Sequence, residues 1–128
     1  TRPWADIDDP EYPTIMERFL KRLGYETVDH SAKTLCCGAS HVISYEDDCM
    51  VLNERIIREL KRKGAQLVAT ICPLCQLNLD SAQARFRGPP IPVPYFTQLA
   101  GLALGIAPEA LGLNKLLVSM EYELKQIL

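Results

Sequence analysis

The sequence predicts an α/β fold, in which a small parallel sheet carries helices on both faces. Helix-like and strand-like patterns alternate along the 128 residues, which is typical of such folds. The run 65–71, AQLVATI, is almost uninterruptedly apolar, as strands buried on both faces are. A hydrophobic content of 48% and a charged content of 23% are ordinary for a globular domain, so residues 1–128 are expected to form one domain.

The first third of the chain predicts one helix and one short strand. Residues 1–12 are rich in Pro and Asp and indicate a loop. Apolar residues follow at helical spacing from Pro13, which suits a first helical turn, and Gly24 is a natural stop. Residues 25–28 are a short strand candidate.

A long helix and the main strand occupy the middle of the chain. Ser44 is the predicted N-cap of a helix that reaches about Lys63, where Gly64 ends it. The strand 65–71 comes next. The remaining elements are, in order, a helix over 74–86, a turn at 87–90, a Pro-limited strand over 91–94, a helix over 96–104, a short helical turn after Pro108 and a tail helix within 119–128.

Four of the five cysteines lie in two motifs, Cys36-Cys37-Gly38 and Cys72-Pro73-Leu74-Cys75, with 34 residues between Cys37 and Cys72. Each motif follows a predicted strand. Because the carboxyl ends of parallel strands meet at one edge of a sheet, both motifs are expected to share one site at that edge.

Five cysteines cannot all pair within the chain, and adjacent cysteines are poor partners. Their Cα atoms lie about 3.8 Å apart, whereas a disulfide prefers about 4.4–6.8 Å. The thiols therefore indicate an intracellular metal or redox site. Three alternatives fit: an iron–sulfur cluster, structural zinc, or a dithiol–disulfide pair at Cys72 and Cys75. A multi-iron cluster suits Cys36 and Cys37 best, because adjacent cysteines can bind different irons.

The two motifs and their spacing resemble the cysteine-rich CCG domain found in the B subunit of heterodisulfide reductases and in its relatives. Residues 91–105 are similar to the C-terminal half of that protein. The resemblance implies a noncubane [4Fe-4S] cluster with Cys36, Cys37, Cys72 and Cys75 among its five ligands. It also implies reductive cleavage of a disulfide, or of a related thiol or carrier-bound sulfur substrate, within an electron-transfer complex.

The fifth cysteine of the family motif would fall at position 4 or upstream of residue 1, and position 4 is Trp4. The interpretation is that the chain is the C-terminal half of a longer subunit. The expected partners are the missing N-terminal CCG domain and the other subunits of the complex. Without them, the domain is expected to lack all or part of its cluster.

Other residues have lesser predicted roles. His41 is a candidate proton donor, or a loop histidine with no special role, and Cys49 is expected to pack in the core. The net charge of -2 and the lack of a basic block argue against nucleic acid. No apolar run approaches the roughly 18 residues of a membrane span, so a cytoplasmic location is expected. The alternative functions are an electron-relay or assembly module and a zinc-stabilised interaction domain.

Overall fold

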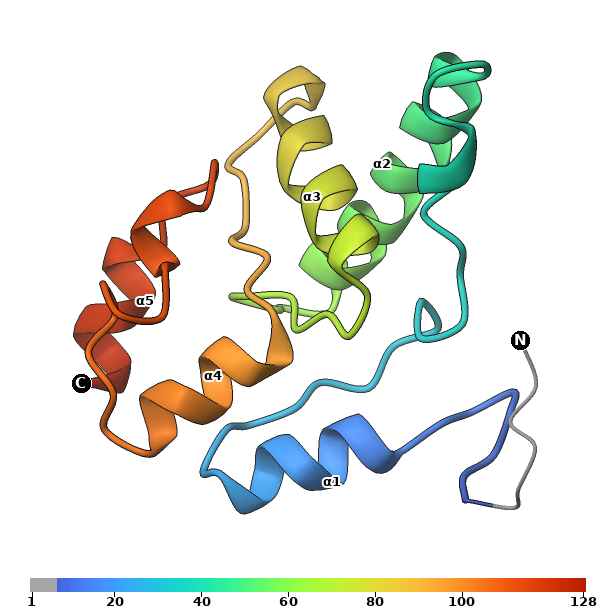
Figure 1. The fold of residues 1–128 in the computed structure, drawn as a ribbon. Helices are drawn as coiled ribbons and strands as arrows, with labels where there is room; N and C mark the ends of the chain where they lie inside the picture. Colours follow the sequence, from blue (N-terminus) through green and yellow to red (C-terminus); the bar gives the residue numbers. More distant parts are fainter. Residues whose placement is uncertain (1–6) are drawn as a thin grey trace.

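The computed structural model describes residues 7–128, and helices account for most of its regular structure (Figure 1). The five α-helices in the described residues are α1 (Ile15–Arg22), α2 (Glu46–Arg62), α3 (Pro73–Ala82), α4 (Phe96–Ala103) and α5 (Glu121–Ile127). Three single-turn 3₁₀ helices connect them, namely η1 (Ala39–His41), η2 (Gln83–Arg85) and η3 (Leu113–Lys115).

The predicted parallel sheet is wrong. Among residues 7–128, the β pairing is one isolated parallel bridge, between Thr70 and Tyr95. The N–H groups of Val68 and Thr70 donate to the carbonyls of Pro92 and Pro94, at 2.9 and 3.2 Å. Because a proline has no N–H, neither Pro92 nor Pro94 can donate a hydrogen bond back to residues 65–71. The β pairing is therefore limited to the bridge between Thr70 and Tyr95.

The first strand candidate, residues 25–28, also forms no strand. Its first side chain is used elsewhere, because the Tyr25 hydroxyl donates to the Leu99 carbonyl of α4 at 2.8 Å. This contact ties the segment after α1 to α4. The cysteine motifs consequently do not lie at the edge of a sheet.

The helices agree better with the sequence pattern. The first helix begins at Ile15, where the Asp8 carboxylate accepts the N–H groups of Thr14 and Ile15, both at 2.7 Å. The Ile15 N–H is the main reason that the pKa of Asp8 is lowered. The long helix α2 begins one residue after Tyr45, so the predicted N-cap at Ser44 is wrong by one position.

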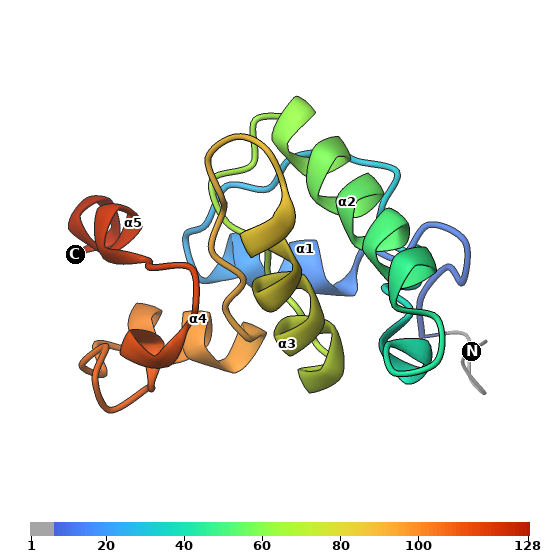
Figure 2. The same cartoon turned by 90° about the horizontal axis from the view of Figure 1, so that it is seen from above.

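The core consists of two groups of buried side chains. The first joins α2 and α3 to residues 91–93 and contains Ala32, Cys37, Ile56, Ile57, Leu60, Leu79, Ile91 and Val93. The second joins α1 and α4 to the C-terminal part of the chain and contains Leu20, Leu99, Leu102, Leu113 and Met120. Figures 1 and 2 show α2 and α3 together on one side and α4 and α5 together on the other. The cysteine motifs belong to the first group, which includes Cys37 itself.

Candidate thiolate site

Each cysteine motif lies at the start of a helix. Cys72 is the N-cap of α3 and Pro73 is its first residue, a position where the missing N–H of proline costs no hydrogen bond. The Cys36-Cys37-Gly38 motif leads into η1, with Gly38 as its N-cap in the left-handed conformation, at φ +75°. The cysteines are therefore positioned by the N-termini of α3 and η1, and not by the ends of two strands as predicted.

The structure brings one cysteine of each motif together. The Sγ atoms of Cys37 and Cys75, 38 positions apart in sequence, lie 3.1 Å apart. Cys37 is buried, and Cys72 and Cys75 are half-buried. Cys36 is exposed, and its sulfur accepts the Gly38 N–H at 3.3 Å.

The thiols of the Cys72-Pro73-Leu74-Cys75 motif differ in acidity. The pKa of Cys72 is lowered, mainly because the backbone N–H of Cys75 donates to its sulfur, with help from the N–H of Leu74. Burial is the main cause that raises the pKa of Cys75 well above its usual range, and hydrogen bonding with Cys37 adds to it. In the metal-free protein, Cys72 is therefore the more readily formed thiolate of the two.

Cys49 is buried beneath the first motif. Its thiol is 2% exposed and donates to the Gly38 carbonyl at 3.0 Å. Burial is the main cause that raises the pKa of this thiol. Through this bond, the side chain of Cys49 supports the backbone of the first motif.

Replacement of Gly38 by alanine is expected to lower the free energy of unfolding by about 2 kcal/mol. The added Cβ would meet the Sγ of Cys49 at 3.0 Å and the Cδ1 of Leu52 at 3.1 Å. The left-handed backbone adds about 1 kcal/mol of strain. Urea denaturation measures the change, with Gly64→Ala as the matched control. Gly64 has φ +80° and no heavy atom within 4 Å of such a Cβ. Gly64→Ala is therefore expected to lower the free energy of unfolding by only about 1 kcal/mol. Equal losses in the two variants would contradict the close packing at Gly38.

The donor atoms fit a metal group that accepts thiolates, with one adjustment. Two sulfurs on a single tetrahedral metal lie about 3.8 Å apart when the metal–sulfur bonds are about 2.3 Å. Cys37 and Cys75 are closer than that, so a small side-chain rotation must separate them to admit a metal. In the part of the chain that the structure describes, no group of three or more His, Cys, Asp or Glu side chains surrounds one point as ligands of a single ion do.

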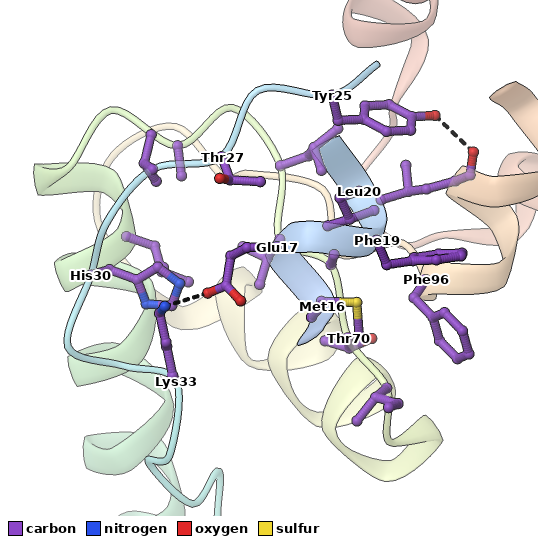
Figure 3. Close-up of a pocket in the computed structure, with 18 of the residues that line it drawn as sticks. Met16, Glu17, Phe19, Leu20, Tyr25, Thr27, His30, Lys33, Thr70 and Phe96 are labelled. Carbon is purple, nitrogen blue, oxygen red and sulfur yellow. Dashed lines mark hydrogen bonds and ion pairs between the residues drawn. The ribbon is translucent and has the colours of Figure 1, made fainter. Parts of the chain in front are cut away.

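A cavity of about 1260 Å³ lies between α1 with the segment after it and the rest of the protein, and Cys37, Cys72 and Cys75 line part of it. Figure 3 shows Glu17 of α1 facing Lys33, and these two form an ion pair at 2.5 Å. Most of the remaining lining is apolar. The thiols therefore adjoin a hollow that is largely apolar and contains a half-buried ion pair.

His41 lies away from this cavity. It lines a smaller cavity of about 320 Å³ together with Gly38, Tyr45 and Cys49, which none of the other four cysteines lines. Its ring packs edge-on against Tyr45, with the centroids 6.0 Å apart. The proton-donor role of His41 stays a prediction to which the geometry adds no contact.

Sequence reasoning does not identify two residues near the thiols, Glu17 and Lys33, and leaves the role of a third, Asn78, open. Lys33 lies three residues before Cys36, but Glu17 is distant in sequence from both motifs, and no local pattern marks the pairing of the two. For Asn78, on the helix after the second motif, the sequence allows either a brace for the cysteine loop or a solvated helix residue; its buried side chain donates to the carbonyl of Cys37 at 2.8 Å. Contacts between distant segments of this kind leave no periodic trace in a sequence.

Comparisons with known proteins were consistent with the motif. The sequence profile of the family described as CCG, cysteine-rich domain, matches residues 4–80. The 8-methylmenaquinol:fumarate reductase membrane anchor subunit of Wolinella succinogenes is 37% identical over 123 residues, which cover 88% of this chain and 42% of that subunit. The B subunit of the ferredoxin:CoB-CoM heterodisulfide reductase of Methanosarcina mazei is 29% identical over 117 residues, which cover 86% of this chain and 39% of that one.

A third relative, from Archaeoglobus profundus, is described as a protein like the B subunit of heterodisulfide reductase. It is 28% identical over 109 residues, which cover 80% of this chain and 36% of that protein. The chain thus spans about two fifths of the length of the curated relatives it matches. The window expected to hold a fifth cysteine includes position 4, which lies outside the described residues. None of the helices in residues 7–128 is both long enough and apolar enough to cross a membrane.

Proposed function

Since this chain belongs to the CCG cysteine-rich domain family, we propose that it binds an iron–sulfur cluster through Cys36, Cys37, Cys72 and Cys75 in a subunit of an electron-transferring reductase. The observation that carries the proposal is the 3.1 Å approach of the Cys37 and Cys75 sulfurs. It joins the two motifs, both of which lie within the residues that the family profile matches, although the predicted sheet edge is absent. Iron–sulfur clusters are held by cysteine thiolates, which is the donor set present.

The divergence of the adjacent cysteines favours a cluster over a single zinc ion. Cys37 is buried against Cys75, whereas Cys36 is exposed and takes the Gly38 N–H. One zinc ion needs four ligands around a single point, and no such group occurs in residues 7–128. A cluster of several irons extends over a larger volume, so thiolates that diverge from neighbouring residues can each bind a different iron.

The cluster that we propose is a noncubane [4Fe-4S] cluster, with a fifth cysteine from outside residues 7–128. Bound there, it would supply one-electron chemistry at sulfur. The protein contributes the lowered pKa of Cys72, which favours the thiolate form, and an adjoining cavity with a largely apolar lining. The substrate that we propose is a disulfide, or a related sulfur compound, cleaved reductively; two of the relatives are named as parts of CoB-CoM heterodisulfide reductases.

A second candidate function is electron relay without disulfide cleavage. It is favoured by the relative that is 37% identical, which is named as the membrane anchor subunit of a fumarate reductase and not as a heterodisulfide reductase. In this alternative the same cysteines hold the cluster, and electrons pass through it to another subunit. The two candidates share the site and differ in whether a sulfur substrate reaches it.

We propose that partner subunits, and the rest of a longer chain, pack around the cysteines in a cytoplasmic complex. Three large apolar side chains in or beside the second motif are exposed, namely Ile71 at 64%, Leu74 at 59% and Leu77 at 62%. Ile43, after the first motif, is 96% exposed. Exposed apolar side chains grouped near a site are typical of a surface that another protein covers.

EPR spectroscopy of the full natural chain, reconstituted with iron and sulfide under anaerobic conditions, separates the candidates. The proposed catalyst should change its EPR signal when it is oxidised in the presence of the thiol product. A relay should give the same signal with and without the thiol. A protein that shows no visible absorption and no EPR signal after reconstitution would contradict both candidates and favour the zinc-stabilised domain.

A further inference from the structure

One helix holds Cys37 at two points. On α3, Cys75 and Asn78 are three residues apart and therefore lie on the same face of the helix. The Cys75 sulfur approaches the Cys37 sulfur at 3.1 Å, and the Asn78 side-chain amide donates to the Cys37 carbonyl at 2.8 Å. The side chain and the backbone of Cys37 are thus both held by α3.

The Asn78 contact also reaches Cys36 through one peptide unit. The carbonyl of Cys37 and the N–H of Gly38 belong to the same planar peptide group. Asn78 binds the carbonyl end, and the N–H end donates to the Cys36 sulfur at 3.3 Å. Because the group is rigid, fixing its carbonyl also fixes the direction of its N–H.

The surroundings leave Asn78 little freedom to make another contact. Its side chain is buried, with the residue 8% exposed, and a buried amide that loses its partner is costly. On the opposite side of the same loop, the Cys49 thiol donates to the Gly38 carbonyl at 3.0 Å. The peptide unit is therefore held from α3, and the next carbonyl is held from α2.

We propose that Asn78 is a positioning residue for both cysteines of the first motif. It sets the Cys37 thiol opposite Cys75 and directs the Gly38 N–H at the Cys36 sulfur. For the cluster-loaded protein, this inference rests on the proposed function. Hydrogen bonds to sulfur tune the reduction potential of an iron–sulfur cluster, so Asn78 would influence that potential through the Gly38 N–H. In the metal-free protein it concerns only the position of two thiols.

The first test measures the approach of Cys37 and Cys75 without any metal. In the metal-free full natural chain, diamide oxidises two adjacent thiols to a disulfide, and its azo group takes up the two electrons and two protons that they release. The rate at which the Cys37–Cys75 disulfide forms is followed by peptide mapping under non-reducing conditions. Asn78→Ala and the isosteric Asn78→Asp, whose ionised form has no donor, are each expected to slow it about tenfold.

Asp80→Ala is the matched control for loss of stability. Asp80 lies on the same helix, is 6% exposed, and accepts the N–H groups of Leu117 and Val118 away from the cysteines. Its variant is expected to unfold more easily and to keep the wild-type disulfide rate. Wild-type rates in both Asn78 variants would overturn the proposal. So would an equal slowing in Asp80→Ala, since general loosening would then explain the effect.

The second test uses the loaded protein. Asn78→Asp is expected to retain iron and to shift the reduction potential and the EPR spectrum, whereas Asp80→Ala should leave both unchanged. An unchanged potential and spectrum in Asn78→Asp would overturn the role at Cys36. If the wild-type protein binds no cluster, the proposed function fails, and the diamide rates still decide whether Asn78 positions Cys37.

Discussion

Replacement of Cys72 or Cys75 by serine is expected to abolish cluster binding in the full natural chain. A serine hydroxyl has nearly the size of a thiol, but it does not ionise near neutral pH and is a poor ligand for iron. Cys36→Ser and Cys37→Ser are expected to have the same effect, because the two motifs meet at one site. Iron content and visible absorption after anaerobic reconstitution measure the loss.

Cys49→Ser is the matched control for these four variants. The Cys49 thiol is buried and donates to the Gly38 carbonyl, and a serine hydroxyl can make the same bond. This variant is expected to keep its cluster and to change the free energy of unfolding by about 1 kcal/mol or less. If Cys49→Ser lost the cluster while Cys36→Ser kept it, the assignment of ligands would be wrong.

Replacement of Gln83 by alanine is expected to lower the free energy of unfolding by about 3 kcal/mol. The Gln83 side chain, 5% exposed as a residue, accepts the Ile91 N–H at 2.9 Å and donates to the Ile91 carbonyl at 2.8 Å. Its loss would leave two buried backbone groups unpaired, at about 1–3 kcal/mol each before any rescue by water. Urea denaturation measures the change, and Gln126→Ala on an exposed face of α5 should fall within about 0.5 kcal/mol of wild type.

Gln83→Glu gives this prediction a dependence on pH. A protonated glutamic acid can both donate and accept, as glutamine does, whereas the carboxylate cannot donate to the Ile91 carbonyl. Burial raises the pKa of the carboxyl in the folded state, so the stability that it contributes is present below about pH 4 and is lost as the pH rises through the folded-state pKa. The role assigned to the two bonds would be contradicted if the free energies of unfolding of Gln83→Glu and Gln83→Ala differed by the same amount at pH 4 and at pH 7.

Gln83 also explains part of the error in the predicted fold. The sequence pattern correctly predicts helices for α1, α2 and α4, because apolar spacing and a following glycine are local signals. The apolar run 65–71 has the pattern of a buried strand, but periodicity alone cannot show whether such a run has partners. Its neighbour, residues 91–94, lacks two N–H donors at Pro92 and Pro94, and the backbone of Ile91 bonds to Gln83.

The candidate site is more accessible to sequence reasoning than the fold. Two cysteine motifs at a particular spacing restrict the chemistry whatever backbone carries them. The position of Cys37 against Cys75 depends instead on how α3 packs on the first motif, through contacts such as Asn78 with the Cys37 carbonyl. Such contacts arise only when the chain folds, and the residue types alone do not single them out.

Analysis of iron, acid-labile sulfide and zinc in the anaerobically purified full natural chain tests the central claim most directly. If the two motifs hold an iron–sulfur cluster, iron and sulfide should be present in about a one-to-one ratio, and both should be lost in Cys75→Ser. A colourless protein with about one zinc per chain, lost in the same variant, would contradict the claim.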